Sequence, residues 1–532
     1  MTEAHLLHHL PLASALARPD ATALTAGTHA LDYGAFAAQV QTFAAGLMAQ
    51  GLRRAERVGI YLEKRFETVV ASFGATAAGG VFVPMNPLLK AEQVAFIARD
   101  CDVRVIVTSP ERLTLLAPVL GQCTALRWVV LTEGGDEPLP TALPPGVELL
   151  RWSQLLAAPP RAGHRVIDTD IAGILYTSGS TGKPKGVVLS HRNMVAGAKS
   201  VASYLENNAQ DTLLAALPLS FDAGFSQLTT AFHVGARVVR LNYLLPRDVL
   251  RTMEREMVTG LTAVPPLYIQ LAALEWPSAI NERLRYFANT GGRMPRETLN
   301  VLRQRAPSAK PFLMYGLTEA FRSTYLPPEE VDRRPDSIGK AIPNAEILVL
   351  REDGSKCAPD EPGELVHRGA LVGQGYWNDA EKTAERYKLL PGREGGLMLP
   401  EYAVFSGDTV RRDAEGFLYF IGRRDEMMKT SGYRVSPTEV EEVLYATKLV
   451  GECVAFGVDD ARLGHAIQVI ASGPDGSATL DLDTLLAECR LRMPAYMVPA
   501  GISAMAGPLP RNPNGKIDRK LLSTAWVDAH MS

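Results

Sequence analysis

The first half of the chain alternates between helical and strand-like spacing of its apolar residues. Residues 31–52 place Phe36, Val40, Phe43 and Leu47 on one side of a predicted helix. Short runs rich in β-branched residues predict buried strands at 56–62, 81–87, 103–109, 127–133, 171–177 and 236–242. Strands that alternate with helices favour a mostly parallel sheet covered by helices on both faces.

The pattern changes near residue 335. Short strands separated by turns are predicted at 345–354, 363–369 and 416–423, which indicates a small β-rich region. Beyond Gly422, two strands (450–458 and 465–473) and a helix (482–493) predict a second compact unit. We therefore expect a large N-terminal domain (1–421), a hinge (422–426) and a small C-terminal domain (427–532).

Composition narrows the classes of function. A chain of 532 residues is too long for a single hydrophobic core, so more than one domain is expected. The formal net charge of −3 makes a nucleic-acid partner unexpected. The N-terminus does not have the pattern of a signal peptide, and no apolar run is long enough to predict a membrane span. Five scattered cysteines without metal-like spacing predict reduced, buried thiols and a cytoplasmic protein, and His5, His8 and His9 are interpreted as polar helix positions.

The segment YTSGSTGKPKG at 176–186 is the most unusual local composition in the chain. It follows the predicted strand 171–177 and precedes a predicted helix at 191–206. Its candidate phosphate-binding residues are Thr177, Ser178, Gly179, Ser180, Thr181, Gly182, Lys183 and Lys185. Glycines let backbone N–H groups approach a ligand, and the hydroxyls and lysines suit a polyphosphate. It is not a Walker A loop, because Pro184 follows Lys183. A flexible connector is the alternative interpretation.

This segment resembles the signature of the adenylate-forming enzymes, which include acyl-CoA synthetases, nonribosomal peptide adenylation domains and luciferases. Further matching segments follow in the family's order: GGRMP (291–295), MYGLTEA (314–320), FSGD (405–408), GRRDEMMKTSGYRVSPTEVE (422–441) and PRNPNGKIDRK (510–520). At closer range the chain is similar to the AMP-forming acyl-CoA ligases associated with bacterial exosortase A systems. The resemblance implies an α/β fold: two doubly wound subdomains and a small β-barrel-like region, followed by a mobile α+β C-terminal domain.

The resemblance also implies a reaction in two halves. A carboxylate attacks the α-phosphate of ATP to give an acyl-adenylate and pyrophosphate, and a thiol then displaces AMP. For the first half, the family's roles fall on Thr318 for phosphate, Glu319 for Mg²⁺, Tyr315, Gly316, Gly291 and Gly292 for adenine, Asp408 and Arg423 for ribose, and Lys516 for the carboxylate and α-phosphate oxygens. A carboxylate is a suitable ligand for Mg²⁺. Taken singly, each of these residues has an ordinary structural interpretation, such as a turn or a helix terminus.

The second half-reaction is implied to use another face of the C-terminal domain. Asp425 corresponds to the family's hinge, and Lys429, Gly432 and Arg434 belong to the face that forms the thioester. No carrier domain follows Lys516 in this sequence, so we expect the thiol of coenzyme A or of the phosphopantetheine of a free-standing carrier protein.

The identity of the acid depends on Asp222, in PLSFDAGFSQL at 218–228. Amino-acid-activating members carry Phe-Asp here, and the aspartate pairs with the substrate's ammonium group. Asp222 could instead stabilise the start of the next helix. Arg322 could face a second substrate carboxylate or pair with Asp222, and in the latter case the amino-acid hypothesis fails. By the same resemblance, the acid pocket would also contain Ala223, Asn289, Gly291 and Met314. An ordinary acyl-CoA ligase and a degenerate nucleotide-binding regulator are the alternatives.

Overall fold

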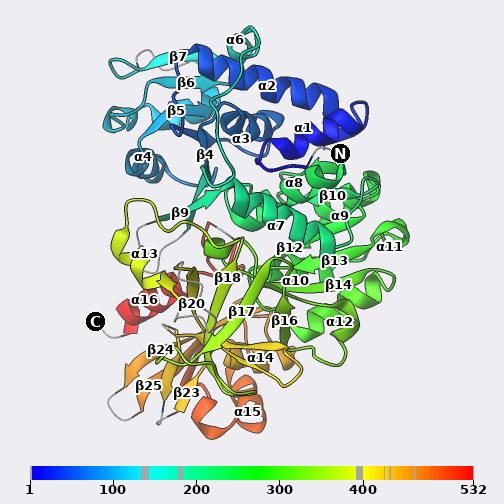
Figure 1. The fold of residues 1–532 in the computed structure, drawn as a ribbon. Coiled ribbons are helices and arrows are strands. Elements are labelled where there is room, and N and C mark those ends of the chain that lie inside the picture. The colour runs from blue at the N-terminus through cyan, green and yellow to red at the C-terminus, as the bar shows by residue number, and fades with distance from the viewer. Residues whose placement is uncertain are drawn as a thin grey trace.

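A computed structural model describes residues 3–132, 143–177, 184–390, 400–424, 426–430, 433–460, 463–513 and 515–530 (Figure 1). The predicted strands of the N-terminal region form a sheet in the order β7-β6-β5-β3-β4-β8-β9. Its strands are β3 (Arg57–Tyr61), β4 (Val81–Met85), β5 (Val103–Thr108), β6 (Trp128–Leu131), β7 (Glu148–Arg151), β8 (Ile171–Thr177) and β9 (Lys185–Ser190). Neighbours are parallel except for the antiparallel pair β8 and β9.

A second sheet begins in the order β2-β1-β11-β10-β12-β13-β14. Its strands are β1 (Thr22–Ala26), β2 (His29–Asp32), β10 (Thr212–Ala215), β11 (Arg237–Arg240), β12 (Gly260–Ala263), β13 (Tyr286–Asn289) and β14 (Lys310–Tyr315). Antiparallel strands extend it into the predicted β-rich region: β15 (Thr324–Leu326), β16 (Ser337–Ala341), β17 (Ala345–Leu350), β18 (Gly363–Gly369), β19 (Tyr387–Leu389), β20 (Tyr402–Arg412) and β21 (Leu418–Arg423).

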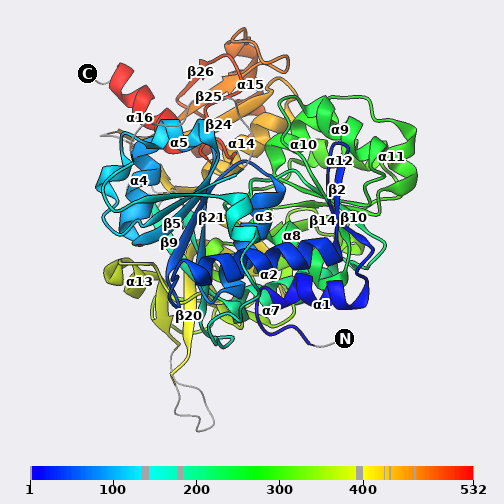
Figure 2. The same ribbon diagram turned by 90° about the horizontal axis from the view of Figure 1, so that it is seen from above.

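Helices separate and cover the two sheets (Figure 2). The shared core between the sheets contains α1 (His9–Ala17), α2 (Tyr33–Ala49), α3 (Phe66–Ala77), α7 (His191–Tyr204) and α8 (Asp222–Val234). The outer faces carry α4 (Ala91–Asp100) and α5 (Pro110–Leu116) on one sheet, and α9 (Pro246–Arg255), α10 (Pro265–Ala272), α11 (Ser278–Arg283) and α12 (Arg296–Arg305) on the other. Leu213 faces the shared core and Leu214 the outer core, which is the two-residue alternation of a strand buried on both faces. The shorter helices are α6 (Trp152–Leu156) and α13 (Ala380–Arg386).

The C-terminal unit has its own sheet and cores. Its strands are β22 (Met428–Thr430), β23 (Tyr433–Val435), β24 (Glu452–Asp460), β25 (Gly464–Ser472) and β26 (Gly501–Ala504). Its helices are α14 (Pro437–Ala446), α15 (Leu482–Arg492) and α16 (Arg519–His530). The chain passes from the large sheet to the small one between Arg423 and Met428. That these units are separate domains joined by a hinge stays a prediction.

The state of the cysteines and the absence of membrane spans are two expectations that the structure can be compared with. All five cysteines are buried free thiols, as the sequence predicts. In the described parts of the chain, every helix is too short or too polar to cross a bilayer.

Candidate active site

The glycine-rich segment connects two antiparallel strands. Thr177 ends β8 and lies opposite Lys185, which begins β9, so the segment forms a hairpin connection rather than a direct strand-to-helix turn. Ser178, Gly179, Ser180, Thr181, Gly182 and Lys183 lie outside the described residues. The structure therefore locates the two ends of the predicted phosphate loop, and the loop's role stays a prediction.

Tyr376 connects one end of this hairpin to Glu319. The Lys185 ammonium lies 5.5 Å from the centre of the Tyr376 ring, and the Tyr376 hydroxyl donates to Glu319 Oε1 at 2.6 Å. Burial, together with the adjacent Glu319, raises the pKa of Tyr376 well above its usual value, so it stays a donor. The sequence motifs do not include Tyr376. It reaches this place through a bridge with Val187, a long-range contact that apolar spacing does not report.

Thr318 and Glu319 lie in a short 3-10 helix, η2 (Thr318–Ala320), that follows β14. The next residue, Phe321, is fully buried and has φ +56° and ψ −39°, a strained conformation for a bulky side chain. This turn places Glu319 and Arg322, two of the predicted site residues, on either side of the strained position. Gly316 leaves room for this turn, since a Cβ there would lie 3.2 Å from Arg322 Cα, a tight contact.

Asp408, Tyr315 and Arg423 form a second cluster, at the ends of β14 and β21 and within β20. The Tyr315 hydroxyl donates to Asp408 Oδ2 at 2.5 Å, and Arg423 Nε lies 3.3 Å from Asp408 Oδ1. Burial raises the pKa of Asp408, while Arg423 and Tyr315 oppose the shift. The resemblance implies that Tyr315 faces adenine. In this structure its hydroxyl also holds the carboxylate that the resemblance assigns to ribose.

Lys516 is presented by a tight turn of the C-terminal unit. A bridge between Arg511 and Ile517 closes the turn, and the Lys516 N–H donates to Asn512 Oδ1 at 3.1 Å. Gly515 has φ +80°, a left-handed conformation that favours glycine. The predicted turn-rich stretch therefore folds as a compact support for one lysine.

This turn contacts the large N-terminal part of the chain. Asn86 Nδ2 donates to Pro513 O at 2.7 Å, which ties the turn to the C-terminal end of β4. Gly291, with φ +76°, lies against the lysine, because a Cβ on Gly291 would be 3.2 Å from Lys516 Cε. Asn289 fixes the backbone beside it by donating to Gly292 O at 2.8 Å. Residues from two of the matched segments, 291–295 and 510–520, thus meet at one place.

Charged residues of the neighbouring clusters act on the Lys516 ammonium. The surrounding protein lowers the pKa of the Lys516 ammonium, although the side chain keeps access to water. The Asp222 and Asp408 carboxylates oppose this shift, and Arg423 adds to it. The Lys516 ammonium is therefore under the electrostatic influence of Asp222 and of the Asp408 cluster.

Asp222 and Arg322 form a buried ion pair. Arg322 Nη1 lies 3.2 Å from Asp222 Oδ2, and the two side chains are 3% and 11% exposed. Asp222 is also the first residue of α8, where its charge is favourable to the helix dipole. Of the alternatives that the sequence leaves open, the pairing of Asp222 with Arg322 is the one present here. The ammonium-binding hypothesis for Asp222 therefore loses its sequence-based support.

The remaining acid-pocket candidates lie around the same pair. Ala223, Met314 and Arg322 line a small cavity, and Met314 Sδ accepts a hydrogen bond from Tyr204 at 3.0 Å. Asn289 is buried at the end of β13, near Gly291. Gln227 and Thr230 also line the cavity. Gln227 lies within the segment 218–228 but is not among the predicted pocket residues, and Thr230 lies just beyond that segment. Their spacing from Ala223 along α8 is the only signal that could have indicated them.

The residues predicted for the second half-reaction lie in or beside the small C-terminal sheet. Lys429 on β22 is paired with Arg434 on β23. The described part of the structure does not include the side chains of Lys429 and Arg434, or the residues Asp425 and Gly432. Their roles stay predictions.

Comparison with known proteins identifies the family. The profile of the AMP-binding enzymes matches residues 13–377, and the profile of the AMP-binding enzyme C-terminal domain matches residues 439–516. The chain belongs to the AMP-binding enzyme family, which confirms the resemblance seen in its motifs.

Individual relatives extend along nearly the whole chain. Feruloyl-CoA synthase from Amycolatopsis sp. is 30% identical, with 95% of this chain and 96% of the relative covered. The L-proline–[L-prolyl-carrier protein] ligase of Pseudomonas fluorescens is 30% identical, with 97% and 99% covered. A linear gramicidin synthase polypeptide from Brevibacillus parabrevis is 27% identical over 97% of this chain, and the chain spans only 10% of the length of that relative.

A solved structure shares the fold. The o-succinylbenzoate coenzyme A synthetase of Bacillus subtilis, in complex with ATP and magnesium ion, superimposes with a TM-score of 0.79 at 25% identity. The match covers 97% of this chain and 99% of that protein. The predicted α/β architecture, with a large N-terminal part and a small C-terminal part, is confirmed.

Proposed function

We propose that this protein is an ATP-dependent carboxylate–thiol ligase. A carboxylate oxygen forms a bond to the α-phosphorus of ATP, and the bond to pyrophosphate breaks. The thiol of a pantetheine arm then forms a thioester with the acyl carbon, and AMP leaves with the former carboxylate oxygen. Because ATP and both candidate acceptors are cytoplasmic compounds, we expect the reaction in the cytoplasm.

The contact between Lys516 and Gly291 is the observation that carries this proposal. The turn that holds Lys516 is hydrogen-bonded to the large part through Asn86, and its ammonium interacts with Asp222 and Asp408. The first half-reaction brings two anions together, so it requires a cation aimed at the charge that develops between them. Lys516 is positioned to be that cation.

The nucleotide would be bound by the residue clusters around Asp408 and around Glu319. Asp408, oriented by Tyr315 and Arg423, can accept hydrogen bonds from ribose hydroxyls. Gly291, Gly292, Gly316 and Tyr315 would contact adenine, and Thr318 with the hairpin from Thr177 to Lys185 would contact the phosphates. These roles follow the family's motifs and stay proposals for this chain.

The residues around Glu319 fit a magnesium ion that is shared with phosphates. One carboxylate oxygen accepts from Tyr376, which orients the group, and the carboxylate remains a hard oxygen ligand. In the described residues, groups of three or more potential metal ligands are absent, which agrees with a Mg²⁺ held by one carboxylate and by substrate phosphates. When bound, the ion would neutralise charge on the phosphate oxygens.

For the second half-reaction, we propose that the C-terminal unit rotates at Asp425 and presents the strand of Lys429, with Gly432 and Arg434, to the acceptor. Relatives named for CoA and for a carrier protein support both acceptors equally. The acceptor is therefore proposed as coenzyme A or a free-standing carrier protein.

The substrate is proposed as a carboxylic acid, with an amino acid as one candidate. The relative named for L-proline supports this candidate, whereas the ion pair between Asp222 and Arg322 favours an acid without an amine. An ammonium group would have to share Asp222 with Arg322.

Acid-dependent exchange of pyrophosphate into ATP tests the first half-reaction. We expect exchange in the wild type, near-complete loss in Lys516→Ala, and little change in the control Lys356→Ala, which removes an exposed lysine from another part of the chain. Loss of exchange at equal extent in both variants, or exchange in Lys516→Ala at the wild-type rate, would contradict the proposal.

A further inference from the structure

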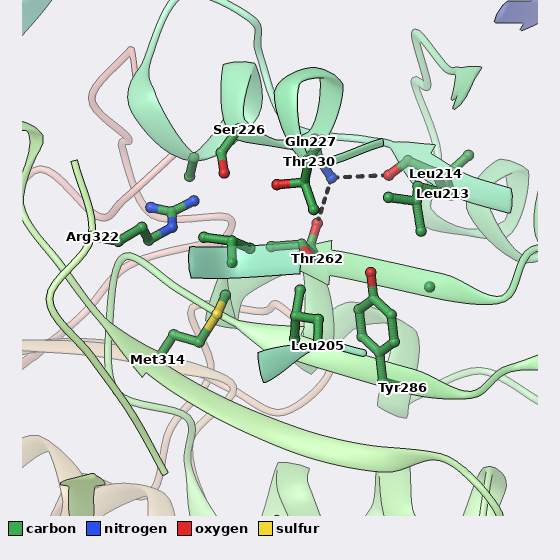
Figure 3. Close-up of a pocket in the computed structure, with 13 residues that line it drawn as sticks. Leu205, Leu213, Leu214, Ser226, Gln227, Thr230, Thr262, Tyr286, Met314 and Arg322 are labelled. Atoms are coloured by element: carbon green, nitrogen blue, oxygen red, sulfur yellow. Dashed lines mark hydrogen bonds between the residues drawn. The ribbon is translucent and has the colours of Figure 1, made fainter. Parts of the chain in front are cut away.

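A small cavity is lined in part by Arg322, the partner of Asp222 (Figure 3). Its volume is about 20 Å³, room for roughly one water-sized group. Its lining includes residues at every third or fourth position of one face of α8, namely Ala223, Ser226, Gln227 and Thr230. The opposite wall includes Thr262 from β12 and Met314 from β14. The cavity therefore lies between α8 and the second sheet.

Polar atoms of the cavity lining have no hydrogen-bond partner among the described residues. They are Gln227 Oε1, Thr230 Oγ1 and Arg322 Nε. These residues are only 6%, 2% and 2% exposed, respectively. The Gln227 amide is fixed in place, because its Nε2 donates to Leu214 O at 2.9 Å and to Thr262 O at 3.1 Å (Figure 3). Its carbonyl oxygen is therefore held as an acceptor. An unpartnered buried polar atom costs about 1–3 kcal/mol, so three around one cavity indicate a site for a ligand group.

A row of packed residues leads from the place where Lys516 lies to the wall of the cavity. Val264 Cγ1 would be 3.3 Å from a Cβ on Gly291, the residue that contacts Lys516. Val264 packs in one cluster with Ala223, which lines the cavity. Along this row, an acid whose carboxylate is near Lys516 would extend its chain past Val264 and Ala223 toward Gln227.

We propose that Gln227, Thr230 and Arg322 select a short acid whose far end carries a small neutral group that both donates and accepts hydrogen bonds, namely a hydroxyl. Gln227 Oε1 accepts only, Arg322 Nε donates only, and the Thr230 hydroxyl does both. A group that satisfies all three must donate to Gln227 and accept from Arg322. This inference rests on the proposed function and specifies its substrate class.

The same atoms disfavour other classes of acid. An alkyl end group would leave the three polar atoms unpaired, and a long chain would meet the second sheet. A carboxylate could accept from Arg322, but it would place its charge against Gln227 Oε1. The small volume also favours a compact end group over an aromatic one.

Matched pairs of acids test this selectivity by pyrophosphate exchange. The pairs are 4-hydroxybutanoate and pentanoate, and 3-hydroxybenzoate and 3-methylbenzoate. In at least one pair we expect the polar acid to exceed its apolar isostere by at least about 100-fold in kcat/KM. In Thr230→Val, the polar acid should lose about tenfold and the apolar isostere should lose nothing.

Thr229→Val is the matched control, because the Thr229 hydroxyl is bonded to Ser226 O at 3.3 Å. Thr230→Val should leave the melting temperature of the free protein unchanged or higher, whereas Thr229→Val should lower the melting temperature without changing selectivity. A loss of stability in Thr230→Val equal to that in Thr229→Val would overturn the inference, since its hydroxyl would then have a structural partner.

The activity results separate the two proposals. Equal exchange with polar and apolar partners, or a preference for fatty acids, overturns the selectivity and leaves the ligase proposal in place. Absence of exchange with every acid, including the proteinogenic amino acids and fatty acids, overturns both.

Discussion

Removal of the Asp222 charge should destabilise the free protein as well as change its activity. The two charged groups are 3.2 Å apart and nearly buried. At an effective dielectric constant of about 20, their attraction is about 5 kcal/mol. Desolvation offsets part of it, and loss of one partner from a buried pair costs about 3–5 kcal/mol because the other charge stays uncompensated. We therefore expect Asp222→Asn to lower the free energy of unfolding by about 3 kcal/mol.

A double-mutant cycle isolates the pair. Asp222→Asn, Arg322→Met and the double variant are compared by urea unfolding, with the m-value checked for constancy. The double variant should be less destabilised than the sum of the two single variants, with a coupling of about 2–3 kcal/mol. Asp332→Asn is the control, because its pair with Arg303 has a 2.6 Å separation but is exposed, and it should shift the midpoint little.

The opposite result would restore the ammonium-binding hypothesis. If Asp222→Asn leaves the stability of the free protein unchanged and abolishes exchange only with amino acids, Asp222 is reserved for a substrate ammonium. Reasoning from the buried pair would then be refuted, including the argument that the pair favours an acid without an amine.

Other predictions concern the reaction cycle and pH. Lys516→Ala should abolish adenylate formation but still transfer from preformed adenylate, and Lys429→Ala should do the reverse; loss of the same half-reaction in both would contradict domain alternation. Asp425→Pro should slow the complete cycle more than either half-reaction, and a full overall rate would count against a hinge. Burial lowers the pKa of His367 to about 3, against about 6.5 in the unfolded chain. The neutral imidazole therefore contributes to stability above pH 6.5. This contribution is lost as the pH falls toward 3, by up to about 1.4 kcal/mol per pH unit. Unfolding midpoints between pH 7.5 and 5 should therefore depend less on pH in His367→Gln, and an unchanged slope would contradict this assignment.

Apolar spacing predicts much of the fold. The strand at 103–109 and the helix at 31–52 are close to β5 and α2, because both are packed on the core in the way their spacing requires. The strand β9 (Lys185–Ser190) was not predicted. Its short apolar run continues directly from a glycine-rich loop and precedes a helix, so local spacing has too few positions to define it. The last helix, α16, was also missed, since its first turn continues the turn-rich segment.

The site is predicted less completely than the fold. The resemblance indicates Lys516 and Gly291, whose contact joins distant parts of the sequence and could not follow from local pattern. Tyr376 belongs to none of the motifs, and Gln227 lies in the segment 218–228 without being among the predicted pocket residues. Only tertiary contacts bring these two residues to Glu319 and to the cavity. The sequence could not decide the partner of Asp222, because the choice depends on a buried distance.

The most direct test of the central claim follows the oxygen of the acid. A substrate acid labelled with ¹⁸O in both carboxylate oxygens is converted in the presence of ATP and an acceptor thiol, and the products are analysed by mass spectrometry. If the carboxylate attacks the α-phosphorus, each AMP released should contain one ¹⁸O and the pyrophosphate none. Label in inorganic phosphate, or unlabelled AMP formed together with thioester, would contradict an acyl-adenylate route.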